Sequence, residues 1–186
     1  RKRGKIGMQR WLRHIQSLLP TIGVTRLVEL AHPSTSFPVY QATRPNALYS
    51  YQLGINSGSE GRGATHTQAK ISCIMEAIET YCEEPKNVHL IRGSHRWLKQ
   101  HHVIADPTRY VLTNRSLTDE PLMWTGAYDI HDDSEILVPA ELVYLPFFSD
   151  EYSTGQFFPI NSNGLASGST FIDAIIHGLY EVIERR

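Results

Sequence analysis

Hydrophobic residues recur at helical spacing in three stretches of the chain. Near the start, Trp11, Leu12 and Ile15 belong to such a pattern, which Pro20 ends. In two later stretches the pattern begins after a threonine, a residue suited to the N-cap of a helix. The pattern predicts helices at 8–19, 65–84 and 170–186.

Shorter stretches alternate between apolar and polar residues, which is typical of strands. The alternation predicts strands at 22–30, 38–43, 48–55, 88–91, 123–130 and 136–145. The last two flank the polar turn 131–134 and read as a hairpin. Two segments rich in glycine and serine, 57–63 and 161–169, are predicted loops. Interleaved strands and helices favour a mixed αβ layer fold, and no linker-like shift in composition divides the 186 residues, so one domain is expected.

Composition narrows the classes of function. The formal net charge of −1 favours no general binding of nucleic acid, and no apolar run has the length of a membrane span. Cys73 and Cys82 are nine residues apart on one predicted helix, too far to form a disulfide. These features fit a cytoplasmic protein. The chain begins without methionine, and we expect it to be a piece of a longer protein.

An internal repeat relates residues 63–79 to residues 168–184, at an offset of 105. Seven of the 17 aligned positions are identical, where unrelated segments would share roughly one. The identities include a glycine, a threonine and two glutamates, so helical periodicity alone does not explain them. Each copy consists of a loop of small residues that ends in glycine and leads into an amphipathic helix.

Both helices of the repeat carry an acidic stripe. Ser72, Glu76, Glu79 and Glu83 share one face of the first helix, and Asp173, His177, Glu181 and Glu184 share one face of the second. One interpretation is a solvated helix face. The other is a shared functional site, because like charges at i and i+3 repel each other, and the first helix has no basic residue four positions after Glu76 or Glu79. Magnesium, which prefers carboxylate oxygens, would relieve that repulsion, and loops that enter helix N-termini offer N–H groups to phosphates.

The repeat also resembles the paired signatures of the YcaO family. The first signature is a glycine loop followed by Ser-x-x-x-Glu-x-x-Glu, present here as Gly61-Arg62-Gly63 and Ser72 to Glu79. The second is Ser-Asn-Gly, then Gly-Asn-Thr, then a helix with Glu-x-x-Glu-Arg, present here as Ser162-Asn163-Gly164, Gly168-Ser169-Thr170 and His177 to Arg185. The resemblance covers nearly the whole chain, which is about half the length of family members.

The resemblance implies an enzyme that uses ATP and magnesium to phosphorylate peptide backbone amides and thereby forms azoline heterocycles or thioamides. It implies that four glutamates hold magnesium, namely Glu76, Glu79, Glu181 and Glu184. The nucleotide-binding residues that it implies are Ser72, Glu76, Glu79, Ser169, Asp173, His177, Glu181, Glu184 and Arg185. No catalytic residue is assigned.

Several positions depart from the family pattern. Thr80 stands where arginine is usual, Arg62 replaces lysine, Ser169 replaces asparagine and Asp173 replaces glutamate. Trp11 lies near a position at which family members often have a small hydroxyl side chain that binds phosphate. These changes favour an alternative, a non-catalytic YcaO-like partner or scaffold protein.

Three partners follow from these considerations: a peptide or protein substrate, a leader-peptide-binding or TfuA-like protein, and a second copy of the chain. The copy is expected because a piece of a fold exposes apolar surface. The two acidic helices should lie side by side, with the loops 61–63 and 162–169 at the edge of one cleft.

Overall fold

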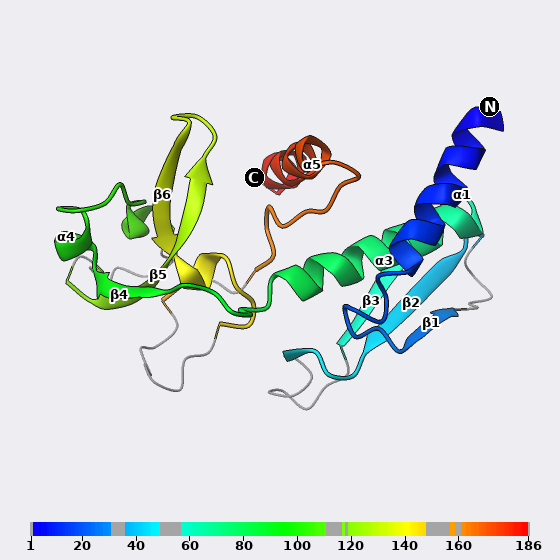
Figure 1. The fold of residues 1–186 in the computed structure, drawn as a ribbon, viewed down its shortest axis with the longest axis horizontal. Coiled ribbons are helices and arrows are strands. Elements are labelled where there is room, and N and C mark those ends of the chain that lie inside the picture. Colours follow the sequence, from blue (N-terminus) through cyan, green and yellow to red (C-terminus); the bar gives the residue numbers. More distant parts are fainter. Residues whose placement is uncertain are drawn as a thin grey trace. The chain divides into compact units, whose positions relative to one another are not determined.

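The structure, a computed structural model, describes residues 2–30, 36–48, 57–110, 117, 119–147, 157–158 and 161–185. They form two compact units, Arg1–Cys82 with Asn163–Arg186 and Glu83–Ser162 (Figure 1). Each unit holds a three-stranded antiparallel sheet together with helices, so the mixed αβ fold predicted from the sequence is confirmed. The strand predicted at 48–55 lies, apart from Leu48, outside the described residues.

The first unit is built around one long helix. Its elements are α1 (Lys2–Gln16), β1 (Arg26–Glu29), β2 (Val39–Arg44), β3 (Ser57–Arg62), α3 (His66–Cys82) and α5 (Phe171–Glu184). The sheet has the order β1-β2-β3, with Val28 opposite Gln41 and Gln41 opposite Glu60. All three predicted helices of the chain are therefore confirmed, with ends shifted by a few residues.

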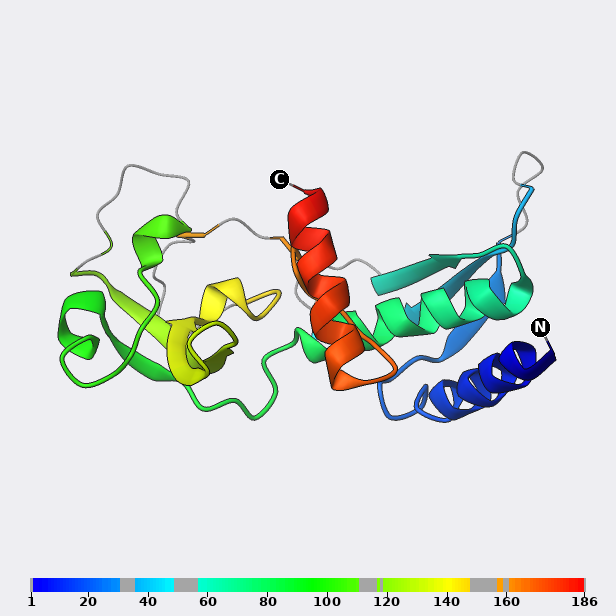
Figure 2. The ribbon, with the colours of Figure 1, turned by 90° about the horizontal axis from the view of Figure 1, so that it is seen from above.

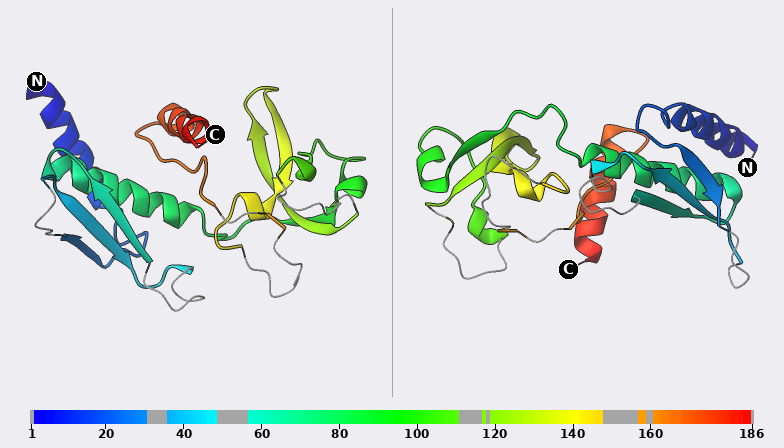
Figure 3. Two further views of the ribbon diagram at one scale, coloured as in Figure 1. Left: turned by 180° about the vertical axis from the view of Figure 1, so that it is seen from behind. Right: turned by 90° about the horizontal axis from the view of Figure 1, so that it is seen from below.

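Helix α3 lies between the sheet and α1 (Figures 2 and 3). Toward the sheet it presents small residues, among them Ala69 and Cys73, which pack against Tyr40 and Ala42. Toward α1 it presents larger ones, with Ile74 buried against two apolar residues of that helix. Helix α3 is thus apolar on two faces, which leaves a narrow strip for the polar residues of its acidic stripe.

The loop predicted at residues 57–63 is wrong. All but the last of them form β3, which pairs with β2 along its whole length. Their glycines mark close packing instead of a turn: a Cβ atom added at Gly61 would lie under 3.0 Å from backbone atoms of Cys73 and Ala69 in α3. Glycine inside a strand often has this role, because it lets another backbone approach.

The second unit contains the predicted hairpin. Its elements are β4 (Ile91–Ser94), α4 (His95–Leu98), η1 (Pro107–Arg109), β5 (Pro121–Asp129), β6 (Ser134–Pro139) and η2 (Ala140–Leu142). Strands β5 and β6 pair across the polar turn, as predicted. The second strand is shorter than predicted, because the chain turns into η2 after Pro139. The strand predicted at 88–91 is wrong except at its last residue, where β4 begins.

Glu141 joins η2 to two buried aromatic residues of the second unit. Its carboxylate accepts a hydrogen bond from the Phe157 N–H at 3.1 Å, and Phe157 and Phe158 pack in the core around Trp124. Burial raises the pKa of Glu141 more than the hydrogen bonds from the two phenylalanine N–H groups lower it. The folded state therefore binds a proton on Glu141 more tightly than the unfolded state does.

This pKa shift leads to an expected pH dependence. Because the folded state binds the proton more tightly, the stabilisation is complete below the ordinary glutamate pKa and is lost as pH rises through the raised pKa. We expect the free energy of unfolding of wild type to fall, relative to Glu141→Gln, as the pH rises above the ordinary glutamate pKa of about 4.3. Urea unfolding at several pH values measures this difference. Glu120→Gln, at an exposed position, is the matched control, and parallel pH profiles for wild type and Glu141→Gln would contradict the expectation.

Helix α5 exposes an apolar face in the first unit. Leu179 and Ile183 are 45% and 66% exposed, whereas Ile74, the repeat equivalent of Leu179, is fully buried between α3 and α1. Other exposed apolar residues on the helix are Phe171, Ile172, Ile176 and Tyr180. None of the helices in the described part of the chain combines the length and apolar character needed to cross a membrane.

Candidate functional site

The two copies of the sequence repeat adopt the same local structure. Thr65 Oγ1 accepts a hydrogen bond from the Gln68 N–H at the start of α3, and Thr170 Oγ1 accepts one from the Asp173 N–H at the start of α5. Both predicted N-caps are therefore confirmed. The glycine that precedes each cap packs against the helix backbone, Gly63 near Ala69 and Gly168 near the repeat-equivalent Ala174.

A second contact is shared by both copies, with the residue sizes reversed. In the first copy the strand provides glycine at position 61, and the helix provides Cys73. At the equivalent positions of the second copy, the loop provides Ala166 and the helix provides Gly178. In each case one partner without a Cβ atom brings the loop or strand close to the helix.

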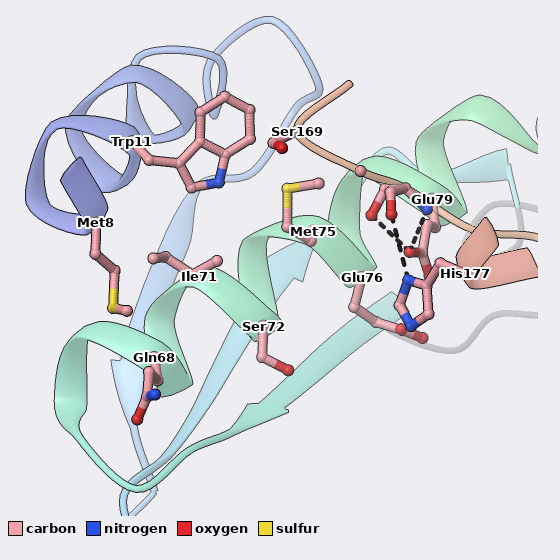
Figure 4. Close-up of a pocket in the computed structure, with 12 residues that line it drawn as sticks. Met8, Trp11, Gln68, Ile71, Ser72, Met75, Glu76, Glu79, Ser169 and His177 are labelled. Carbon is pink, nitrogen blue, oxygen red and sulfur yellow. Dashed lines mark hydrogen bonds between the residues drawn. The ribbon is translucent and has the colours of Figure 1, made fainter. Parts of the chain in front are cut away.

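A cavity of about 530 Å³ lies in the first unit (Figure 4). One part of it is apolar, with Met8 and Trp11 from α1 facing Ile71 and Met75 from α3. The other part is polar, and its residues come from α3, from the loop before α5 and from α5 itself. The polar lining consists of Gln68, Ser72, Glu76, Glu79, Ser167, Gly168, Ser169 and His177.

The acids of the two helices make hydrogen bonds to the loop of the second copy. Glu79 Oε1 accepts hydrogen bonds from the N–H and the hydroxyl of Ser167, at 2.7 and 2.6 Å. Glu181 accepts one from the Gly164 N–H at 3.0 Å and forms an ion pair with Arg185. The loop before α5 is thereby attached to both acidic stripes.

Glu76 is influenced by acids of both stripes. Its pKa is raised, first by desolvation and then by the charge of Glu79 and a hydrogen bond with it, and by the charge of Glu181; Arg185 opposes this shift. The side chain remains exposed to solvent, so the protein around it removes only part of its hydration. The charges of Glu79 on α3 and of Glu181 on α5 therefore both act on Glu76.

The predicted site residues are distributed in three ways. Those that line the cavity are Ser72, Glu76, Glu79, Ser169 and His177. Glu181 and Arg185 do not line the cavity, but their charges act on the pKa of Glu76. Asp173 and Glu184 are exposed, and hydrogen bonds from Ser169 and Thr170 lower the pKa of Asp173.

Two further observations qualify the predicted geometry. The glycine segment 61–63 does not line the cavity, because β3 lies on the sheet side of α3. Within the described ranges, no three His, Cys, Asp or Glu side chains are grouped closely enough to hold a metal ion.

Sequence reasoning missed the apolar part of the cavity and the role of Ser167. The helical spacing of Trp11 gives no sign that it faces Met75 across a cavity. Ser167 precedes the repeated Gly168, within a loop that was itself predicted to be at the site. That proximity was the available signal, but it does not indicate which acid the hydroxyl contacts.

Comparison with known proteins gives consistent matches. A family model described as YcaO cyclodehydratase, ATP- and Mg²⁺-binding, matches residues 60–186. An uncharacterized protein of Methanothermobacter thermautotrophicus is 38% identical, over 90% of this chain and 42% of its own length. An uncharacterized protein from the tfuA 3′ region of Rhizobium leguminosarum bv. trifolii is 33% identical, over 92% of this chain and 39% of its own. The structure of YcaO from Methanopyrus kandleri, bound with AMPPCP and Mg²⁺, superposes with a TM-score of 0.71 at 26% identity, over 97% of this chain and 42% of that one.

Proposed function

Since the chain belongs to the YcaO family, we propose that the whole protein uses ATP and magnesium to activate peptide backbone amides by phosphorylation. The chain spans about two fifths of the length of the relatives it matches, so the proposal concerns the longer protein. One observation carries it: acids of the first repeat, the loop of the second repeat and His177 of α5 meet at a single cavity.

The residues at this cavity fit magnesium and a nucleotide. Glu76 and Glu79 offer carboxylate oxygens, with Glu181 close by, and these are the ligands that magnesium prefers. Ser169 lies directly before the N-cap of α5, where backbone N–H groups and the helix dipole favour phosphate oxygens. When bound, magnesium-ATP would supply the phosphoryl group that makes the amide oxygen a leaving group.

The side chains of the chain would then bind and orient. We assign magnesium to Glu76, Glu79, Glu181 and Glu184, and nucleotide contacts to Ser72, Ser169, Asp173, His177 and Arg185. The raised pKa of Glu76 supports a cation near the acids, because a positive charge would relieve the repulsion by Glu79 and Glu181. Arg185 is suited to phosphate oxygens, since its guanidinium is always charged.

A second candidate function is a non-catalytic YcaO-like partner. It is favoured by the hydrogen bonds that already satisfy the acids: Glu79 has two donors from Ser167, and Glu181 has Gly164 and Arg185. These acids therefore do not require a cation in the present arrangement. Thr80 and Arg62, which depart from the family pattern, favour the same candidate.

One experiment separates the two candidates. ATP is titrated calorimetrically into the full-length protein in the presence and in the absence of magnesium. Phosphate release is then measured with candidate peptides. Mass spectrometry of the peptide distinguishes loss of water, for an azoline, from replacement of oxygen by sulfur, for a thioamide. Magnesium-dependent binding with peptide-dependent phosphate release is expected. Failure to bind the nucleotide would leave only the non-catalytic candidate.

Partners are part of the proposal. The relative from a tfuA region supports a TfuA-like partner, and so makes the thioamide the product to test first. The substrate is a peptide or protein whose backbone amide reaches the cavity. The exposed apolar face of α5 supports contact with a second copy, which light scattering of the chain tests.

A further inference from the structure

Ser167 connects the two repeats at the cavity. Its N–H and its hydroxyl both donate to Glu79 Oε1 on α3, and its carbonyl oxygen lies 3.3 Å from Nδ1 of His177 on α5. Figure 4 shows these interactions as dashed lines between the loop, Glu79 and His177. A single loop residue thus contacts one cavity-lining side chain from each helix of the repeat.

The loop that carries Ser167 is packed tightly against α5. Gly164 and Ala166 lie against Gly178, and a Cβ atom added at Gly168 would meet the backbone of Ala174. The Gly164 N–H is also bonded to Glu181. Because its neighbours on both sides are fixed to the helix, Ser167 presents its two donors from a position that is set by α5.

The two donors determine how Glu79 is oriented. Both bind the same oxygen, Oε1, and hydrogen bonds to a carboxylate are stronger than those between neutral groups. Glu79 also forms a hydrogen bond with Glu76, so Ser167 contacts an acid that is connected to the rest of the stripe on α3. In the first repeat the position equivalent to Ser167 is Arg62, which is exposed at the end of β3. The contact of a serine with Glu79 is therefore a feature of the second copy.

We propose that Ser167 is a positioning residue that orients the Glu79 carboxylate for magnesium. Partners that orient a metal-binding carboxylate affect metal affinity without touching the metal. This inference rests on the proposed function, and it adds a coupling between the repeats. A nucleotide that contacts the loop before α5 would, through Ser167, affect an acid on α3.

The test uses the full-length protein and measures the magnesium concentration needed for half-maximal ATP binding. In Ser167→Ala this concentration is expected to rise about tenfold, since one charge-assisted hydrogen bond is lost while the backbone N–H bond remains. Ser167→Thr, which keeps the hydroxyl, should restore most of the affinity. Ser17→Ala is the matched control. Ser17 is an exposed residue directly after α1, and its hydroxyl donates to the carbonyl of His14 within that helix.

A double-mutant cycle separates positioning from a general structural effect. If Ser167 acts through Glu79, then Ser167→Ala should change the magnesium requirement less than about twofold in a Glu79→Gln background. An effect of equal size in both backgrounds would overturn the inference, as would an unchanged magnesium requirement in Ser167→Ala. If wild type itself binds no magnesium-ATP, the proposed function fails first, and the inference fails with it. Thermal melts ensure that all variants are compared in the folded state.

Discussion

Replacing Gly61 with alanine is expected to lower the free energy of unfolding of the first unit by about 3 kcal/mol or more. The added Cβ atom would lie under 3.0 Å from the N and Cα atoms of Cys73 and from the Ala69 carbonyl oxygen. These are backbone atoms of α3, so no side-chain rotation relieves the clash. Strand β3 and helix α3 would have to move apart, although they form the core of the first unit.

Native-state hydrogen exchange measures this effect where it occurs. In Gly61→Ala the amides of α3 should lose protection, while those of β5 in the second unit should keep theirs. Gly126→Ala is the matched control, because a Cβ atom added there meets nothing within 4 Å. It should change stability by no more than about 0.5 kcal/mol. Unchanged α3 protection in Gly61→Ala would show that strand and helix do not pack as closely as described.

Replacing Glu76 with glutamine is expected to weaken ATP binding by the full-length protein at least about tenfold in the presence of magnesium. A neutral amide oxygen carries only a partial charge and cannot replace a carboxylate as a magnesium ligand. Without ligand the same variant should be as stable as wild type, or more stable, because the ionised Glu76 is disfavoured by desolvation and by Glu79 and Glu181. Calorimetric titration and thermal melts measure the two effects separately.

Glu181→Gln is a useful comparison, since it should differ from Glu76→Gln in the unliganded state. Glu181 accepts the Gly164 N–H and pairs with Arg185, so its replacement should cost about 0.5–1.5 kcal/mol of stability. Glu120→Gln, at an exposed position of the second unit, should change neither quantity. If Glu76→Gln binds ATP as tightly as wild type, the stripe on α3 is a solvated helix face and holds no metal.

Helices and their caps could be predicted from the sequence for a local reason. An amphipathic pattern and an N-cap depend on residues within a few positions of each other, as Thr65 and Gln68 illustrate. Strand β3 was mistaken for a loop, because glycine and serine are frequent in both settings. The difference lies in Cys73 and Ala69, which come close to Gly61 only in three dimensions.

The same limit applies to the candidate site. The repeat indicates Glu76, Glu79 and Glu181 as candidate site residues, because identical residues at a fixed offset can be recognised from the sequence alone. The packing of α1 on α3 is not visible in that way, so the repeat gives no sign that Trp11 lines the same cavity as Glu76 and Glu79. Ser167 belongs to the same class: its hydroxyl is local, but its partner on α3 is 88 residues away.

The reversed sizes at Gly61–Cys73 and Ala166–Gly178 bear on how the two copies can evolve. Exchanging the residues at 61 and 166 alone would put alanine against Cys73 and leave glycine facing glycine at 178, so one contact would be overfilled and the other left loose. A change of the partner side chain does not remove this constraint, because a Cβ atom at Gly61 meets backbone atoms of Cys73, and a Cβ atom at Gly178 meets the Gly164 carbonyl oxygen. Recombination between the copies, or a chimera that joins the strand of one to the helix of the other, would therefore have to keep the glycine on the side where each copy has it.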